Sequence, residues 1–238
     1  MSLPLDYSYK LLRCFKISCK IMNVLMIGWE FPPIVAGGLG KACHGLAKSM
    51  AKLGVNLNFI IPKAPYEMDC DFLNLRVASF YQKEGIMVRR INSLINPYVT
   101  EEMYSDYIKK ISKVTKTAEV YGKNLIEEVY LFSHNVIDAS EDLDFDLIHV
   151  HDWVTFPAGI TLKRRYKKPL FVHVHACEFN RTNNSPDPKR YEIERSGFMV
   201  ADKVITISEL MKNLIHEKYD IPLEKIEVVH NGLADEAL

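Results

Sequence analysis

The chain has 238 residues, of which 48% are apolar and 25% are charged, and its formal net charge at pH 7 is zero. This length predicts one α/β domain with a large core, and the balanced charge argues against a nucleic-acid-binding surface. The five cysteines follow no metal-binding or disulfide spacing, which indicates a reduced, cytoplasmic protein.

Residues 1–21 contain apolar side chains interrupted by charges at Lys10, Arg13 and Lys16. Such interruptions argue against a signal peptide or a membrane span. We therefore expect residues 1–21 to be an upstream extension or an expression remnant that lies outside the fold. The domain itself is expected to begin at Met22.

An apolar strand over Val24–Ile27 precedes a loop that contains Gly37, Gly38 and Gly40, and the helix that follows ends at a C-cap at Gly54. Glycines before a helix suit phosphate, because backbone amides and the positive end of the helix dipole face the anion. The loop is therefore a candidate phosphate-binding segment.

Neither standard phosphate fingerprint fits this loop. Cys43 stands where a dinucleotide loop needs a third glycine or alanine, and Ala42 follows Lys41 where a nucleoside triphosphate loop needs Ser or Thr. A dinucleotide-dependent oxidoreductase is thus a remote alternative.

The middle of the chain has weaker patterns. Strands are expected at Leu57–Ile61, Phe72–Ala78 and Ile86–Ile91, and a long amphipathic helix over Tyr121–Val136. Residues 92–116 are interpreted either as an exposed helical insertion or as a plain surface loop.

The second half of the chain alternates between strands and helices. The expected strands are Leu147–Val150, Leu170–Val174, Lys203–Ile207 and Ile226–Val229, and the expected helices are Phe156–Tyr166, Lys189–Val200 and Ser208–Tyr219. This alternation predicts a Rossmann-like three-layer α/β sandwich with a mainly parallel sheet.

Five polar or glycine-rich segments each follow the carboxyl end of a predicted strand. They are Glu30–Gly40, His151–Trp153, His175–Phe179, Ser208–Glu209 and His230–Gly232. Ligands of open α/β sheets bind at that edge, so the five segments together predict a binding site there.

The strands carry two His-x-His pairs, His149 with His151 and His173 with His175. Inward-facing pairs could bind a metal ion. We instead interpret His149 and His173 as core histidines satisfied by hydrogen bonds, with His151 and His175 beyond the strand ends, and we expect no metal. The aspartate-rich run 142–146 precedes a strand and is interpreted as a solvated turn.

In order and spacing, these motifs resemble the N-terminal domain of bacterial and archaeal glycogen and starch synthases, which are retaining glycosyltransferases of the GT-B fold. The resemblance begins at about Met22 and covers the rest of the chain. The motifs are Trp29-Glu-Phe-Pro-Pro33, Gly37-Gly-Leu-Gly40, His149-Val-His-Asp-Trp153, Val172-His-Val-His175, Ala201-Asp-Lys-Val-Ile-Thr-Ile-Ser208 and Val229-His-Asn-Gly232. Val35 departs from the lysine usual in bacterial glycogen synthases, which favours broader or archaeal-type relatives.

The resemblance implies roles for individual residues. Gly37, Gly38 and Gly40 would approach the donor diphosphate and sugar. His175 would lie at the donor sugar, where its carbonyl or imidazole could stabilise charge as the glycosidic bond loosens. Asp152 would be the second catalytic residue, near the acceptor.

Further residues are implied on the acceptor side of the site. His151 and Trp153 would shape the acceptor cleft, and Glu178 and Arg181 are candidates for contacts with sugar hydroxyls. The polar loop 181–190 could close over the acceptor.

The resemblance also implies a domain organisation. Residues 22–232 would form the acceptor-side domain and residues 233–238 the start of the crossing to a donor domain that is absent here. Transfer would proceed without metal or other cofactor, from ADP- or UDP-glucose to the non-reducing end of an α-1,4-glucan, and not by this chain alone. The alternatives are another GT-B acceptor (sucrose-phosphate synthase-like, polysaccharide or lipid) and a non-catalytic carbohydrate- or nucleotide-binding module.

Overall fold

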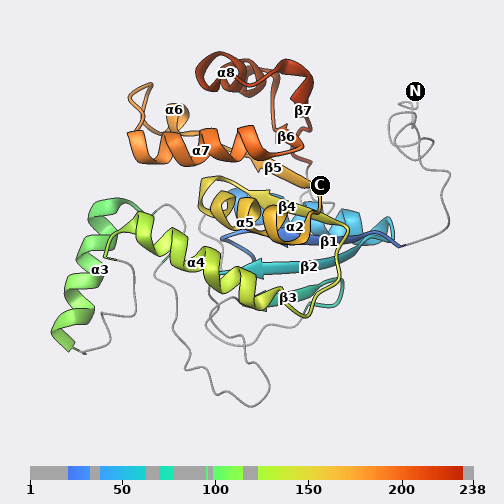
Figure 1. Cartoon of the computed structure of the whole chain (residues 1–238), viewed down its shortest axis with the longest axis horizontal. Coiled ribbons are helices and arrows are strands. Elements are labelled where there is room, and N and C mark those ends of the chain that lie inside the picture. The colour runs from blue at the N-terminus through green and yellow to red at the C-terminus, as the bar shows by residue number, and fades with distance from the viewer. Residues whose placement is uncertain are drawn as a thin grey trace.

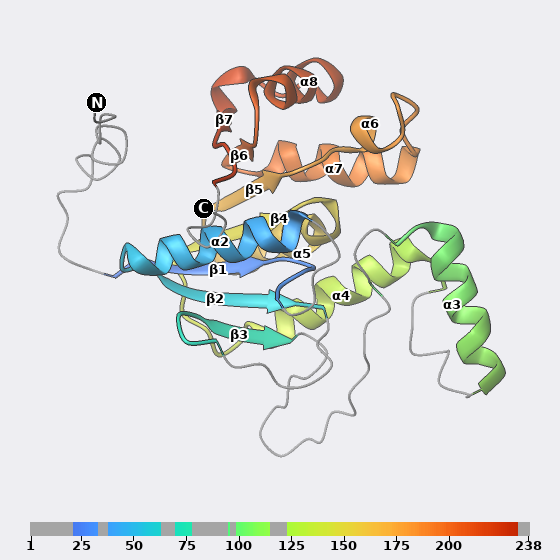
Figure 2. The ribbon, with the colours of Figure 1, turned by 180° about the vertical axis from the view of Figure 1, so that it is seen from behind.

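The computed structural model describes residues 21–32, 38–62, 70–77, 95, 99–114 and 123–232. These residues form a seven-stranded sheet with the order β3-β2-β1-β4-β5-β6-β7 (Figures 1 and 2). Every neighbouring pair of strands is parallel. The predicted Rossmann-like α/β fold is confirmed.

The observed elements lie close to the predicted ones. The strands are β1 (Asn23–Ile27), β2 (Asn56–Ile61), β3 (Asn74–Val77), β4 (Leu147–His151), β5 (Leu170–Val174), β6 (Lys203–Thr206) and β7 (Ile226–Val228). The helices are α2 (Gly38–Lys52), α3 (Glu101–Val114), α4 (Leu125–Ala139), α5 (Phe156–Tyr166), α6 (Glu178–Arg181), α7 (Pro188–Val200) and α8 (Glu209–Tyr219), with short 3-10 turns at Trp153–Thr155 and Leu223–Lys225. The strand expected at Ile86–Ile91 lies outside the described residues.

Helices cover both faces of the sheet. In Figure 1, α4 and α7 lie in front of the strands, and in Figure 2, which shows the opposite side, α2 lies in front. The helix α5 packs closely on β4 and β5, because a Cβ added at Gly159 would lie 2.8 Å from Val150 and 2.9 Å from Leu170. Side chains alternate along a strand, so His149 and His151 face the opposite side, toward α2.

The apolar core explains why these segments fold as predicted. Four consecutive residues of β1, from Val24 to Ile27, are fully buried, as expected for a central strand covered on both faces. On α4, buried apolar residues recur at three- and four-residue spacing. The Asn124 side chain caps this helix by accepting the Glu127 backbone N–H at 3.0 Å. Among the described residues, no helix has the length and apolar character needed to cross a bilayer.

The insertion between β3 and β4 contains a helix, α3, so a plain loop is the wrong interpretation for Glu101–Val114. Tyr104 of α3 is fully buried, and its hydroxyl donates to Glu128 of α4 at 3.1 Å. Burial, followed by the nearby Glu128 carboxylate, raises the pKa of Tyr104. This buried bond joins the insertion to the core.

Gly197 of α7 packs closely against the core, and its substitution tests how tight that packing is. A Cβ there would lie 2.8 Å from Cγ of Phe156, a fully buried ring. We expect Gly197→Ala to lower the free energy of unfolding by about 1–3 kcal/mol through overpacking. In the matched control, Gly45→Ala in α2, the new methyl group meets nothing within 4 Å, so a gain of about 0.5–1 kcal/mol is expected. Urea unfolding of both variants measures the difference, and equal effects would contradict the prediction.

Candidate functional site

The described parts of the polar segments predicted from the sequence lie along one edge of the sheet. Because all seven strands are parallel, the residues that follow β1, β4, β5, β6 and β7 emerge on the same side. His230 Nδ1 also lies 3.0 Å from the carbonyl oxygen of Ile207, the residue before Ser208. Ser208 caps α8 as expected, accepting the Met211 backbone N–H at 3.2 Å. This edge is the candidate site.

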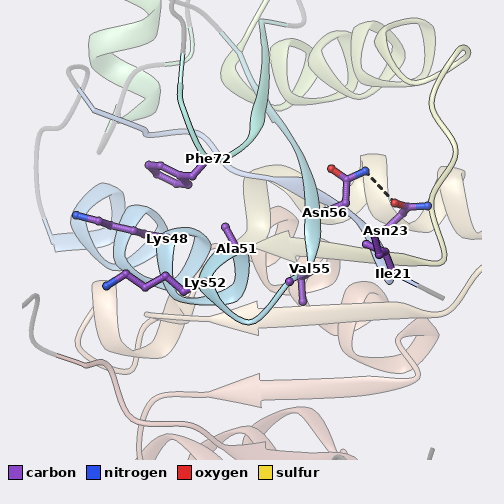
Figure 3. Close-up of a pocket in the computed structure, with 9 residues that line it drawn as sticks. Ile21, Asn23, Lys48, Ala51, Lys52, Val55, Asn56 and Phe72 are labelled. Carbon is purple, nitrogen blue, oxygen red and sulfur yellow. Dashed lines mark hydrogen bonds between the residues drawn. The ribbon is translucent and has the colours of Figure 1, made fainter. Parts of the chain in front are cut away.

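An open groove lies at the opposite edge, beside the amino ends of β1 and β2 (Figure 3). It has a volume of about 910 Å³, and its lining includes Lys48, Lys52 and Phe72. Ligands of open parallel sheets bind at the carboxyl ends of the strands. The groove is therefore not the candidate site.

Asp152 follows β4 in a backbone conformation that is rare for any residue except glycine, with φ 57° and ψ 168°. Such a conformation costs about 1–3 kcal/mol and persists only where the surroundings enforce it. Here the Asp152 N–H donates to the His173 carbonyl at 2.9 Å. The Asp152 carbonyl accepts the Thr155 hydroxyl at 2.9 Å and the Thr155 N–H at 3.0 Å.

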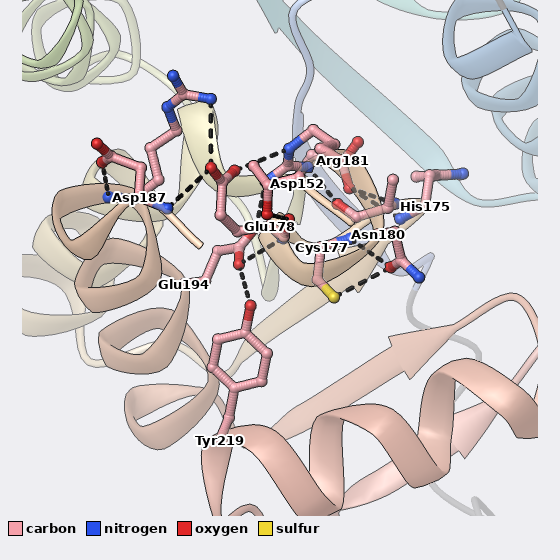
Figure 4. Close-up of polar contacts among 12 residues, drawn as sticks. Asp152, His175, Cys177, Glu178, Asn180, Arg181, Asp187, Glu194 and Tyr219 are labelled. Atoms are coloured by element: carbon pink, nitrogen blue, oxygen red, sulfur yellow. Dashed lines mark hydrogen bonds and ion pairs between the residues drawn. The ribbon is translucent and has the colours of Figure 1, made fainter. Parts of the chain in front are cut away.

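This conformation directs the Asp152 carboxylate at the turn after β5 (Figure 4). Asp152 Oδ1 accepts the His175 backbone N–H at 2.8 Å and lies 3.5 Å from the Ala176 nitrogen. Arg181 donates to the Ala176 carbonyl from the other side. The two predicted catalytic residues, His175 and Asp152, are thus in contact through a turn that is held at both its amides and its carbonyl.

The histidines differ from their predicted placement. His151 belongs to β4 and is fully buried, so the expectation that it lies beyond the strand end is wrong. Its Nδ1 lies 3.2 Å from Nε2 of His175. Among the described residues, the side-chain nitrogens of His173 and Nε2 of His149 have no hydrogen-bond partner, which differs from the prediction of satisfied core histidines.

Burial is the largest influence on all four imidazoles. It lowers the pKa of His149 to about 4 and that of His173 to about 2, with neighbouring histidines adding to the effect. The pKa values of His151 and His175 are also lowered, although the Asp152 carboxylate partly opposes this for His175. The rings are therefore neutral at neutral pH and can donate from one nitrogen and accept at the other.

The glycines of the predicted donor loop lie where α2 begins. Gly38 is the first residue of the helix and Gly40 is buried in its first turn. A Cβ at Gly38 would meet no atom of the described residues within 4 Å. Gly37 lies outside the described residues. Donor binding by these glycines stays a prediction.

Glu178 and Arg181 belong to a set of buried polar contacts that we call the Glu194 network (Figure 4). Glu194 accepts hydrogen bonds from the Arg181 guanidinium, the Tyr219 hydroxyl and, at 2.9 Å, the Glu178 backbone N–H. The Glu178 carboxylate accepts Arg181 Nε at 3.1 Å and Arg190 Nη1 at 3.4 Å. The negative charges of two carboxylates are thus neutralised by the positive charges of two guanidinium groups, next to the turn that carries His175.

Two members of the Glu194 network, Glu178 and Arg181, are predicted to contact the acceptor, and they differ in their exposure to solvent. Glu178 is fully buried, so a direct sugar contact would require the network to open. The Arg181 side chain remains 25% exposed. Burial raises the pKa values of Glu194 and Tyr219, the two members that sequence reasoning missed. Their separation from Glu178 in the sequence leaves no local signal of these contacts.

Trp153 is only 4% exposed and lies in the turn after Asp152. The Arg190 guanidinium is 5.8 Å from the centroid of its ring. A sugar could stack on that ring only by displacing its neighbours. Trp153 is therefore buried beside the candidate site. Its role in shaping the acceptor cleft stays a prediction.

Comparisons with known proteins agree with the family resemblance that the motifs at the carboxyl edge of the sheet suggest. The model of the family described as starch synthase catalytic domain matches residues 23–226. An uncharacterised glycosyltransferase of Methanocaldococcus jannaschii is 25% identical over 89% of this chain and 46% of its own length. A glycogen synthase of Mycobacterium tuberculosis is 24% identical over 89% of this chain and 48% of its own length. The chain thus spans about half the length of these curated relatives.

Two solved structures share the fold. Sucrose-phosphate synthase of Thermosynechococcus elongatus aligns with a TM-score of 0.62 and 14% identity, over 89% of this chain and 48% of that one. The catalytic domain of starch synthase IV of Arabidopsis thaliana, bound to ADP and acarbose, aligns with a TM-score of 0.55 and 14% identity, over 92% and 53%. With the family model matching most of the sequence, the chain belongs to the starch synthase catalytic domain family of glycosyltransferases.

Proposed function

We propose that this chain is the acceptor-side half of a retaining glycosyltransferase. In this proposal the enzyme transfers glucose from ADP- or UDP-glucose to the non-reducing end of an α-1,4-glucan in the cytoplasm. The observation that carries the proposal is the clamped turn, in which Asp152 holds the amides before and after His175 at the carboxyl edge of the sheet. Membership of the starch synthase family supports the reaction class.

The geometry suits stabilisation of developing charge. His175 emerges directly after β5, and Asp152 fixes its backbone amide, so the position of this residue at the edge is preorganised. Fixed dipoles aimed at the reacting centre stabilise a transition state without reorganising during the reaction. Gly37, Gly38 and Gly40 would present amides to the donor diphosphate. We propose that the nucleotide sugar is the only co-substrate and that the transfer step uses no metal.

The proposed division of labour gives the chain the acceptor and leaves most donor contacts to a C-terminal domain. The structure of starch synthase IV, which aligns over about half of its length, was solved with ADP and acarbose, a nucleotide and a sugar-like ligand. We therefore expect the 238-residue chain to bind a glucan but not to transfer glucose.

Calorimetry on the purified chain tests this function. Maltoheptaose is expected to bind weakly, and Asp152→Ala to weaken that binding, because Asp152 is the residue assigned to the acceptor side; His134→Ala, which removes an exposed histidine on α4, should leave it unchanged. Incubation with ADP-glucose or UDP-glucose and glycogen should transfer no glucose unless the C-terminal half of the enzyme is supplied. Tight binding of NAD⁺ without maltoheptaose binding would refute the proposal, and no transfer after supplying that half would favour a binding module.

A further inference from the structure

Three buried histidines face α2 from the centre of the sheet. His149 and His151 are two residues apart on β4, and His173 of β5 lies opposite His151 in the strand register. The ring centroids of His149 and His151 are 4.5 Å apart, and those of His151 and His173 are 5.0 Å apart. One possible ligand atom from each residue lies within 4.8 Å of the other two.

These imidazoles have unused nitrogens. Nε2 of His149, Nε2 of His151 and both ring nitrogens of His173 are buried without a hydrogen-bond partner in the part of the chain that the structure describes. The residues are 5%, 0% and 4% exposed. A buried polar group without a partner costs about 1–3 kcal/mol, so an arrangement with four such atoms calls for something that binds them.

The chemistry of the set suits a metal ion. Neutral imidazole is the form that coordinates metals, and each of these rings offers a buried nitrogen without a hydrogen-bond partner among the described residues. His151 Nδ1 lies 3.2 Å from His175 Nε2, and donation along that contact leaves Nε2 of His151 with a free lone pair. Ligating histidines typically donate their other N–H in this way, which fixes the tautomer.

We propose that His149, His151 and His173 form a binding site for one borderline transition-metal ion of the zinc class. Three histidines are an established donor set for Zn²⁺, which takes a fourth ligand in tetrahedral geometry. Zinc–nitrogen bonds of about 2.0–2.1 Å place the ligand atoms about 3.4 Å apart, so nitrogens now up to 4.8 Å apart must approach by rotation of the rings.

A second candidate ligand set shares His151 with the first. Cys43 of α2, His151 and His175 also have ligand atoms within 4.8 Å of one another. Zinc accepts both thiolate and imidazole ligands. The site would join α2 to β4 and β5. It requires no step of the proposed sugar transfer and stands independently of it.

The test uses the tag-free chain, stripped with a chelator and desalted. Titration with Co²⁺ is expected to give the visible bands of a four-coordinate site, and Zn²⁺ calorimetry to show one equivalent bound. His173→Ala should weaken Zn²⁺ binding at least tenfold, since even loss of a supporting partner costs about 10–100-fold. The control His134→Ala removes an exposed histidine on α4 and should change nothing.

Two results would overturn the metal site. One is a wild-type chain that gives no Co²⁺ bands and retains no zinc after desalting, which decides the matter even if His173→Ala fails to fold. The other is a folded His173→Ala variant, checked by circular dichroism, that binds Zn²⁺ as tightly as the wild type.

Discussion

Arg181→Ala is expected to lower the free energy of unfolding by about 3–5 kcal/mol, because removing one partner of a buried ion pair leaves a buried charge without compensation. Arg181 bonds to Glu178, to Glu194 and to the Ala176 carbonyl. The side chains of Glu178 and Glu194 are 0% and 1% exposed, so both carboxylates depend on protein groups for their hydrogen bonds. Urea unfolding measures the loss.

A surface pair provides the control for Arg181. Arg165 bonds to Glu141 at 3.0 Å with side chains 49% and 27% exposed, so Arg165→Ala should cost about 0–1 kcal/mol. Arg181→Lys keeps the charge but not the planar fork, and an intermediate loss is expected. Similar losses for Arg181→Ala and Arg165→Ala would show that the Glu194 network contributes no more than a surface pair.

The Arg181→Ala deficit should also depend on pH. Burial raises the pKa of Glu194 above its ordinary 4.5, and the Arg181 charge is the first opposing influence. Without Arg181 the pKa rises further, and the folded state then binds more protons than the unfolded state. A group of this kind favours folding at low pH and loses that contribution as the pH rises. The deficit should therefore be larger at pH 7 than at pH 5.

Asp152→Ala is expected to cost about 1.5–3 kcal/mol, the range for hydrogen bonds to a charged group. The variant loses the acceptor of the His175 amide and keeps the unfavourable backbone conformation. Asp152→Gly loses the same acceptor but is free to adopt positive φ, so it should be more stable than Asp152→Ala by about 1–3 kcal/mol. Thermal unfolding of the variants measures this order.

Asp144→Ala is the matched control for Asp152, since Asp144 is exposed and lies before β4. A change within about 0.5 kcal/mol is expected there. If Asp152→Gly were no more stable than Asp152→Ala, the conformation at Asp152 would not be strained. If Asp152→Ala behaved like Asp144→Ala, the carboxylate would not hold the turn at His175.

The central strands of the sheet could be predicted because a strand that is buried on both faces is apolar at nearly every position. Central parallel strands are nearly continuous apolar runs, and Val24–Ile27 is predicted on that basis. The helix α4 was predictable from apolar residues at helical spacing. The side of the sheet on which the motifs meet followed from the order of strands and helices, since parallel strands share one carboxyl edge.

The interactions of the candidate site were less predictable, because they depend on residues far apart in the sequence. The bond from Tyr219 to Glu194 spans 25 residues, and no spacing rule connects them. The sequence presented Arg181 as part of a polar loop, whereas most of its partners are buried. The hydrogen bonding of His149 and His173 depends on which groups pack against their rings. The alternation of residues along the strands does not identify those groups.

The position of β1 between β2 and β4 bears on the order of folding. From β4 onward each strand pairs with the next one in the chain, so Asp152, His175 and the Glu194 network belong to a region of local connections. The junction of β1 with β4 joins distant segments, as the bond from the Asn23 N–H to Asp146 across 123 residues shows.

Contacts between distant segments form slowly, because the entropy of closing a long loop must be overcome first. We therefore expect the region from β4 to β7 to become structured before β1 and α2 dock beside it. During synthesis, β1 and α2 leave the ribosome before β4, with which β1 must pair. The two halves of the candidate site would then meet only in a late step, when the exposed edges of β1 and β4 close on each other.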